Sequence, residues 1–299
     1  MKDTLNTKTL FVIDANSLIH RAFHALPPFT SPDGKPTGAL YGLTNILLKI
    51  LKEKKPDYIV AAYDTPEPTF RDREFTEYKG TRPPIDDTLL PQLIESPKVF
   101  DLLGIKKLKA PGWEADDIIM TVATKFAREG VRVEIFSGDL DILQAVDGKN
   151  IVAEIPKKGI SNSVTYDKQA VLDRFGVSPE KLADYKGLVG DTSDNIPGIK
   201  GIGPKTAAML INKYGTLEDM YEDIETVGMD NKTLLQKLID GKKDALMSKR
   251  LARLSREAPV DISLEELAVA SFNTDALTKY LEELGFKTLV LRLNREYNQ

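Results

Sequence analysis

Short apolar segments, several of which run directly into an aspartate, constrain the fold of this chain more than any other feature. Apolar residues recur at three- and four-residue steps over 40–51 and again over 118–126, which is the spacing of amphipathic helices. Four short apolar runs with the character of buried strands lie around these helices, at residues 10–13, 58–63, 131–136 and 150–155. Strands that alternate with helices predict an α/β fold, in which a mostly parallel sheet is flanked by helices.

Three of the predicted strands are followed by an aspartate. Asp14 and Asp64 come directly after strands, and Asp139 follows a third strand after Ser137 and Gly138. In open α/β sheets, ligands bind outside the carboxyl ends of the strands, so we expect these three acids to converge at one edge. Further acids that stand in compact groups along the chain are Glu114, Asp116, Asp117, Asp141, Asp191 and Asp194.

Each of these acids has a structural explanation when it is considered alone, as a helix cap or a turn residue. Their joint convergence does not, because two carboxylates about 5 Å apart repel by roughly 3 kcal/mol at an effective dielectric constant near 20. Several such pairs would consume much of the roughly 5–15 kcal/mol that stabilises a domain. A cluster of carboxylates therefore predicts a bound cation, and ligands that are all oxygen suit Mg²⁺ or Mn²⁺.

Composition narrows the chemistry further. The chain of 299 residues has no cysteine and only two histidines, which excludes thiolate sites and leaves little material for Ser-His-Asp catalysis. His20 and His24 are four residues apart on a predicted helix, but no cysteine or carboxylate motif completes a zinc site around them. No apolar run reaches the roughly 20 residues that span a bilayer, and the start of the chain is polar. We expect a cytoplasmic protein without membrane contact.

A basic segment follows the second predicted strand. If residues 69–82 are helical, then Arg71, Phe75, Lys79 and Arg82 lie on one face, with Tyr78 beside Lys79. The alternative is a solvated face, which we prefer for Arg73. The charged stretch 69–109 is predicted to be helical, broken by its prolines, and to leave the sheet as an excursion. Net charge is −4, yet without the nine clustered acids the chain would carry about +5, so the surface outside the acid cluster can be positive.

Residues 198–206 resemble a P-loop superficially, but Pro204 displaces Lys205 by one position from the P-loop lysine. The preferred interpretation is a helix-hairpin-helix turn that binds backbone phosphate, and a plain loop between helices is the alternative. Gly203 would then allow close approach of phosphate or adopt a positive φ. The residues that we assign to this contact are Lys200, Gly201, Gly203 and Lys205. Short helices with glycine and proline between them begin near Asp167, where we place a domain boundary.

Four blocks of sequence carry a resemblance to a known family. Residues 11–16, 112–118, 137–141 and 190–205 resemble the bacterial 5′→3′ exonuclease, or flap endonuclease, family, and in particular its members at the N-terminus of DNA polymerase I. The resemblance extends from about Leu10 to Leu293. It implies a PIN-like nuclease domain over 1–167, including a helical clamp at about 69–109. It also implies a helix-three-turn-helix domain and a C-terminal return over 168–299.

The resemblance also implies roles for individual residues. One metal site would comprise Asp14, Asp64, Glu114, Asp116 and Asp117, and a second Asp139, Asp141, Asp191 and Asp194, with Asp116 or Asp139 near both ions. Lys79 and Arg82 would contact the scissile phosphate, and Tyr78 would stack on a splayed nucleotide. Arg71 would serve the 5′ end, and Arg21 would contact DNA near the active site. Main-chain carbonyls would hold potassium, and by position they belong to Leu188, Val189, Pro197, Ile199 and Ile202.

The function expected from the resemblance is that of a structure-specific 5′ nuclease with two divalent ions. It would cut duplex DNA that has a 5′ end or flap, leave a 5′-phosphate and a 3′-hydroxyl, and remove primers or flaps in replication and repair. We expect a monomer that works with a DNA polymerase domain in the same or a separate chain. Two alternatives remain: a ribonuclease on a related sheet, which has no use for the hairpin, and a non-catalytic DNA-binding module, which has no use for the full acid set.

Overall fold

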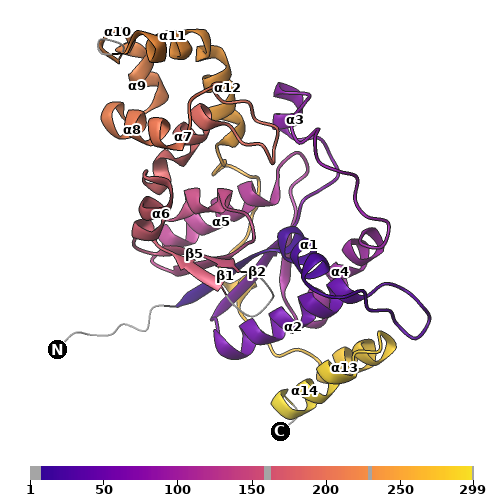
Figure 1. The fold of residues 1–299 in the computed structure, drawn as a ribbon. Coiled ribbons are helices and arrows are strands. Elements are labelled where there is room, and N and C mark those ends of the chain that lie inside the picture. The colour runs from indigo at the N-terminus through magenta and orange to yellow at the C-terminus, as the bar shows by residue number, and fades with distance from the viewer. Residues whose placement is uncertain (1–7, 158–162, 228–230, 298–299) are drawn as a thin grey trace, which may run out of the picture.

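The computed structural model describes residues 8–157, 163–227 and 231–297, and it is built around one six-stranded sheet (Figure 1). The strand order is β3-β2-β1-β4-β5-β6, and all neighbours are parallel except β5 and β6. The strands are β1 (Thr9–Asp14), β2 (Tyr58–Ala62), β3 (Lys106–Leu108), β4 (Arg132–Phe136), β5 (Ile151–Pro156) and β6 (Ser163–Tyr166). The predicted fold class is confirmed. The polar start of the chain, which supported the expectation of a cytoplasmic protein, lies outside the described residues.

The four predicted strands are present, whereas the two edge strands, β3 and β6, were not predicted. β3 has only three residues, two of them lysines, and β6 alternates between polar and apolar residues. Short, charged strands are common at sheet edges, where they discourage pairing with other chains. Such strands give little of the apolar signal by which buried strands are recognised.

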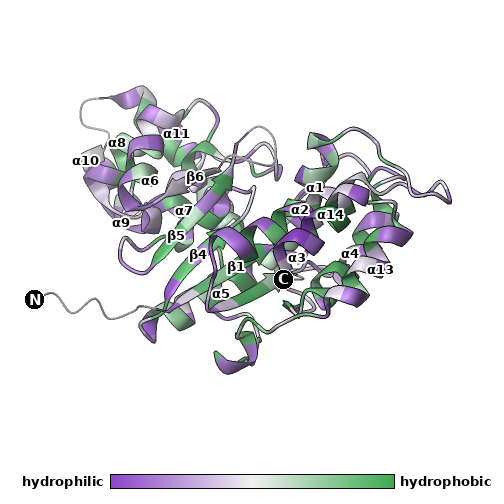
Figure 2. Cartoon of the chain, turned by 90° about the horizontal axis from the view of Figure 1, so that it is seen from below, coloured by the Kyte–Doolittle hydropathy of each residue, from purple (hydrophilic) through white to green (hydrophobic). Residues whose placement is uncertain are grey.

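Alternate residues of β1 enter two separate cores. Leu10 and Val12 pack toward α5 (Ala115–Arg128), while Phe11 and Ile13 pack toward α1 (Ala15–Ala25) and α2 (Gly38–Glu53). This alternation follows from the two-residue period of a strand. The apolar colour of Figure 2 is accordingly concentrated in the strands and in the helices that cover them.

A group of helices follows the sheet and forms the second part of the molecule. Its elements are α6 (Lys168–Phe175), η2 (Pro179–Lys181), α7 (Leu182–Val189), α8 (Pro204–Tyr214), α9 (Leu217–Glu222), α10 (Ile224–Val227), α11 (Lys232–Asp240) and α12 (Lys242–Ala252). α12 packs along α7, so the end of this group lies against its beginning. After η3 (Glu265–Leu267) the chain returns to the sheet, where α13 (Thr274–Glu283) and α14 (Lys287–Tyr297) complete the core beside α2 (Figure 1). No helix among the described residues is long and apolar enough to cross a membrane.

The predicted helix over residues 69–82 is wrong beyond its first turns. α3 (Phe70–Glu74) begins with a capping box in which Thr69 and Asp72 exchange hydrogen bonds, but Phe75 is extended at φ −142°. Tertiary hydrogen bonds replace helical ones in the remainder: the amide of Lys79, at φ 54°, donates to the carbonyl of Asp194 at 2.9 Å. The basic residues of this segment therefore do not share one helix face.

The proline-rich part of the same segment also differs from the prediction. α4 (Leu90–Leu102) continues through Pro97, which was expected to break it. Pro91 occupies the first turn, where a missing N–H leaves no hydrogen bond unmade. The predicted excursion thus ends in one continuous helix that packs on α2.

Candidate active site and nucleic-acid interface

The carboxyl ends of β1, β2 and β4 meet at the start of α5, as the positions of the aspartates predict. Asp14 caps α1, with one oxygen 3.0 Å from the amide of Ser17 and the other 2.6 Å from the hydroxyl of Ser137. Asp64 accepts a 2.8 Å hydrogen bond from the amide of Ala115, the first residue of α5. The hydroxyl of Ser137 also accepts the amide of Asp139 at 2.9 Å. One hydroxyl thus joins two of the acids.

The pKa values of three of these carboxylates are raised because the groups are buried and lie near one another. The pKa of Asp14 is raised to about 7, chiefly by burial and also by the neighbouring Asp64 and Asp139, against two hydrogen bonds that lower it. Burial also raises the pKa of Asp116 well above its ordinary value, with contributions from Asp139, Asp14, Asp64 and Glu114. The pKa of Asp139 is raised chiefly by burial. Charge repulsion within this set would be relieved by a cation.

The other acids of the site are already paired with cations of the chain. Lys79 lies 2.9 Å from Glu114, and Arg82 lies 2.6 Å from Asp194. On α7, Lys186 bridges Asp191, at 2.6 Å, and Asp141. Although burial opposes it, Lys186 lowers the pKa of Asp191. Sequence reasoning missed Lys186, whose only signal was its place five residues before Asp191.

The ligand chemistry of the site fits a hard divalent cation. Every candidate ligand is a carboxylate oxygen, which is the preference of Mg²⁺ and Mn²⁺. In the part of the chain that the structure describes, however, no three acidic or histidine side chains form a ready-made cage around one point. The described arrangement therefore offers suitable ligands, and lysine and arginine side chains neutralise the charge of some of them.

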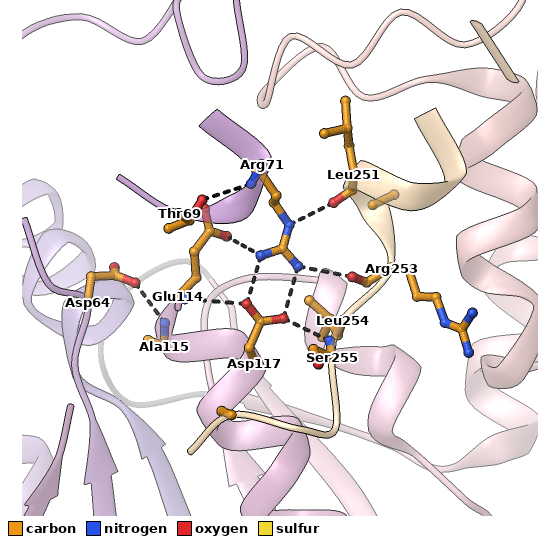
Figure 3. A network of polar contacts seen from close by, with 12 residues as sticks. Asp64, Thr69, Arg71, Glu114, Ala115, Asp117, Leu251, Arg253, Leu254 and Ser255 are labelled. Atoms are coloured by element: carbon orange, nitrogen blue, oxygen red, sulfur yellow. Dashed lines mark hydrogen bonds and ion pairs between the residues drawn. The ribbon is translucent and has the colours of Figure 1, made fainter. Parts of the chain in front are cut away.

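Asp117 does not fit its predicted role as a metal ligand (Figure 3). Its carboxylate is fully buried and accepts two hydrogen bonds from the guanidinium of Arg71, at 2.7 and 2.9 Å. The amides of Glu114 and Ser255 donate to the same carboxylate at 3.3 and 2.8 Å. These four bonds use its acceptor positions.

Arg71 and Tyr78, for which DNA contacts are predicted, are buried in this structure, and those contacts stay predictions. The side chain of Arg71 is 1% exposed, because it faces Asp117 rather than solvent. Tyr78 is 6% exposed, and its hydroxyl lies 3.0 Å from Asp194 and 3.2 Å from Glu114. Its ring therefore has no open face on which a base could stack.

The turn before α8, for which phosphate binding is predicted, brings two backbone segments into contact. Gly198 and Gly190 both have positive φ, and a Cβ on Gly198 would lie 2.2 Å from the amide nitrogen of Gly190, so the two backbones touch. Lys200, Gly201, Gly203 and Lys205 are exposed around the turn. Lys237 on α11, which sequence reasoning missed, donates to the carbonyl of Gly201 at 3.2 Å.

Gly203 differs from one expectation. Its φ is −97°, so no positive φ is needed there, and a Cβ would meet no atom within 4 Å. Of the two reasons given for a glycine at position 203, only close approach of a phosphate from outside the chain remains. Arg21 lies on α1 and is half-buried, and its DNA contact stays a prediction.

The carbonyls predicted to hold potassium come from the same turn. The carbonyl of Leu188 accepts the amide of Ile199 at 2.8 Å, and the carbonyl of Ile199 accepts the amide of Ile202 at 3.1 Å. Carbonyl oxygens have two lone pairs, so both retain one for a cation. Potassium at Leu188, Val189, Pro197, Ile199 and Ile202 stays a prediction.

Comparison with known proteins identifies the family. Residues 9–176 match the family described as "5'-3' exonuclease, N-terminal resolvase-like domain", and residues 177–275 match "5'-3' exonuclease, C-terminal SAM fold". The chain belongs to the 5′–3′ exonuclease family. A "5'-3' exonuclease" of Aquifex aeolicus (strain VF5) is 35% identical over 292 residues, covering 98% of this chain and 97% of that protein. The resemblance found in the sequence is thereby confirmed.

Another member of the 5′–3′ exonuclease family is much longer than this chain. DNA polymerase I of Bacillus subtilis (strain 168) is 39% identical over 289 residues, which cover 97% of this chain and 32% of the polymerase. The chain therefore spans about one third of the length of such relatives.

Solved structures of low sequence identity share the fold. Bacteriophage T5 5'-exonuclease with bound zinc ions matches with a TM-score of 0.68 at 20% identity, over 93% of this chain and 99% of that one. The catalytic core of Rad2 in complex with a DNA substrate matches with a TM-score of 0.60 at 18% identity, over 93% of this chain and 88% of that one.

Proposed function

We propose that this chain is a structure-specific 5′ nuclease, acting as a 5′→3′ exonuclease and flap endonuclease on duplex DNA. The observation that carries the proposal is the convergence of Asp14, Asp64, Asp116 and Asp139, where burial and then mutual repulsion raise the pKa of Asp14 and Asp116. Family membership, together with the metal ions and the DNA substrate bound in structural neighbours, supports the same activity. The products would be a 5′-phosphate and a 3′-hydroxyl.

Two divalent ions, Mg²⁺ or Mn²⁺, fit the acids of the site. Asp14, Asp64, Glu114 and Asp116 would hold one, and Asp139, Asp141, Asp191 and Asp194 the other, with Asp116 or Asp139 near both. When bound, such ions supply an activated water and neutralise charge on the leaving oxygen of a phosphodiester. Asp117 is left out, because Arg71 and two amides already occupy it.

Lys79 and Arg82 would contact the substrate once metal ions are bound. Lys79 and Arg82 now lie against Glu114 and Asp194, beside the cluster. Once these two acids are neutralised by other cations, the ammonium and guanidinium groups are available to the scissile phosphate. Donors placed in advance of the reaction stabilise the negative charge that develops in the transition state. The nucleophile would be the activated water, so no side chain of the protein needs to attack the phosphodiester.

The hairpin turn would bind backbone phosphates of the duplex at some distance from the bond that is cut. Lys200, Gly201, Gly203 and Lys205 are exposed at the start of α8, where amides and lysines suit backbone phosphate. A potassium ion on the carbonyls of Leu188, Val189, Pro197, Ile199 and Ile202 would add positive charge there. The length of the DNA polymerase I relatives supports a role beside a polymerase domain, in primer or flap removal during replication and repair. We propose that this chain itself acts as a cytoplasmic monomer.

A 5′-labelled flap duplex tests the proposal. With Mg²⁺ or Mn²⁺ we expect cleavage near the flap junction, short labelled products and a 5′-phosphate on the remaining strand. Without divalent ions we expect none. Preferential cleavage of single-stranded RNA would favour the ribonuclease alternative. Tight duplex binding without any cleavage would favour a non-catalytic DNA-binding module.

A further inference from the structure

The buried pair of Arg71 and Asp117 joins three separate parts of the chain (Figure 3). Besides its two bonds to Asp117, the guanidinium donates to the carbonyl of Leu251 at 2.8 Å and to that of Arg253 at 3.0 Å. The remaining N–H faces Glu114, whose oxygen lies 3.4 Å away. All five donors of the guanidinium thus point at acceptors of the protein.

The same pair is satisfied from the side of the carboxylate. Asp117 accepts from Arg71 with both oxygens, from the amide of Glu114 and from the amide of Ser255. Although burial opposes it, Asp117 raises the pKa of Arg71, so the guanidinium stays charged. A buried ion pair repays its desolvation only when its geometry and additional hydrogen bonds are this complete.

The three parts joined by the pair carry or support the two groups of acids. Asp117 lies in the first turn of α5, next to Asp116 and three residues after Glu114. Residues 251–255 form the end of α12 and the three residues that follow it. α12 packs along α7, which leads into Asp191 and Asp194. α3, which carries Arg71, leads into the segment of Lys79 and Arg82. The pair is therefore a fixed connection between two groups of acids: Glu114 and Asp116, at the start of α5 beside the sheet, and Asp191 and Asp194, in the helical part.

We infer that Arg71 and Asp117 are positioning residues, which fix the spacing of the two groups of acids and bind neither metal nor DNA. The inference rests on the proposed function, since it assigns the pair a task within that site. Breaking the pair from either side should loosen α5 relative to the end of α12. Because both groups of acids must face shared ions, looser spacing should weaken divalent binding even without DNA.

A titration of the DNA-free protein with Mn²⁺, followed by the rise of its unfolding temperature, tests the inference. Arg71→Met, Asp117→Asn and the double variant should each shift the Mn²⁺ midpoint by about 10-fold or more, the usual effect of losing a group that orients ligands. The double variant should resemble the single variants, because the residues act as a unit. Arg71→Lys should not restore the midpoint, since an ammonium cannot replace the planar fork. Circular dichroism establishes that each variant is folded.

Lys249→Met is a matched control. Lys249 lies on α12 and is mostly buried, but its ion-pair partners, Asp184 at 2.6 Å and Glu218, lie on α7 and α9 rather than on α5. It should lower the unfolding temperature while leaving the Mn²⁺ midpoint where it is in the parent. An equal midpoint shift in Lys249→Met would mean that any loss of packing has this effect, and would overturn the inference.

Two other outcomes would overturn it in different ways. If Asp117 is a metal ligand, Asp117→Asn weakens Mn²⁺ binding, whereas Arg71→Met frees the carboxylate and leaves binding unchanged or tighter. If Arg71 is a DNA contact, Arg71→Met leaves the Mn²⁺ midpoint unchanged but weakens binding of a 5′-phosphorylated duplex, measured in Ca²⁺. A parent protein that binds Mn²⁺ as expected but does not cleave flap DNA would refute the proposed function alone.

Discussion

Two sets of acids from the same site have opposite electrostatic situations. Asp14, Asp116 and Asp139 have raised pKa values and, in the part of the chain that the structure describes, make no ion pair with a lysine or arginine. Glu114 and Asp191, by contrast, lie against lysines. The charged form of the first set is destabilised by burial and repulsion, which an added cation or protonation relieves, while the second set is stabilised by the lysines of the chain. The difference supports the proposal that metal binds to the first set, at the centre of the site, and that phosphate binds at its rim, where Lys79 and Arg82 lie.

The largest effect is expected from the centre of the site. Asp116→Ala or Asp139→Ala should reduce cleavage by at least about a thousandfold, the upper range for losing one preorganised stabilising group. Without metal, either variant should be as stable as the parent or more so, because a repelling carboxylate is gone. Glu114→Ala should instead lower stability, since Lys79 loses its partner. Cleavage rates in Mg²⁺ and urea unfolding in a chelator measure both effects. Normal cleavage by Asp116→Ala and Asp139→Ala would remove the assignment.

At the rim of the site, substitutions of Lys79 and Arg82 should lower the rate of cleavage more than the affinity for DNA. Lys79→Ala or Arg82→Ala should slow single-turnover cleavage by about a hundredfold, because each is proposed to stabilise charge on the scissile phosphate. Duplex binding should change much less. Arg73→Ala is the control, since Arg73 is exposed on α3 and is assigned no contact with the substrate. Losses confined to the dissociation constant would make Lys79 and Arg82 ordinary backbone contacts.

The dependence of stability on pH should have opposite signs for the two sets. The folded pKa of Asp14, about 7, lies above its ordinary value of 3.8, so the metal-free protein should lose stability as pH rises from about 4 to 7. Asp14→Asn removes this loss, which is worth up to about 4 kcal/mol at about 1.4 kcal/mol per unit. Asp191, whose pKa is lowered, stabilises the protein above its ordinary pKa, so Asp191→Asn should cost stability at neutral pH. Urea unfolding midpoints, measured in a chelator from pH 4 to 8, give the stability of each variant. If the midpoints of Asp14→Asn and Asp191→Asn change with pH in the same way, the two sets of acids do not differ as described.

The smallest effect is expected at the hairpin, far from the centre. Lys205→Ala should weaken binding by a similar factor for unrelated duplex sequences and reduce the salt slope by about one unit. The cleavage rate at saturating DNA should fall far less than for Lys79→Ala. Lys279→Ala, on the distant helix α13, is the control. Gly203→Val adds bulk where the structure has open space, so it should affect DNA binding but not stability. If Lys205→Ala and Gly203→Val both bind like the parent, the hairpin is only a connector.

The positions of the central acids could be predicted because strand ends have a fixed place in the fold. Asp14, Asp64 and Asp139 follow apolar strands, and the ends of parallel strands meet at one edge by geometry alone. Glu114 and Asp116 could be added because they open an amphipathic helix that must pack on that sheet. Local pattern and global fold agree at these positions, and there the prediction of convergence was correct.

The partners of the charged residues could not be predicted, since they depend on tertiary contacts. Arg71 and Asp117 look in the sequence like an exposed cation and another site acid, and only folding places the carbonyls of residues 251 and 253 around the guanidinium. The helix predicted through Lys79 ends early because Asp194, more than a hundred positions away, accepts its amide. Helical propensity over a short segment is weaker than such contacts.

The return of the chain to the sheet separates the order of synthesis from the order of folding. Leu277, Leu281, Leu289 and Leu293 are buried in the same core as Phe11 and Leu43, although they are made more than 200 residues later. The sheet therefore emerges during synthesis with one side of α2 still open to water. The core on that side closes only after α14 has been translated, so the growing chain must keep an apolar surface soluble until then. Removal of the last two helices should accordingly yield a protein that aggregates, rather than a smaller nuclease.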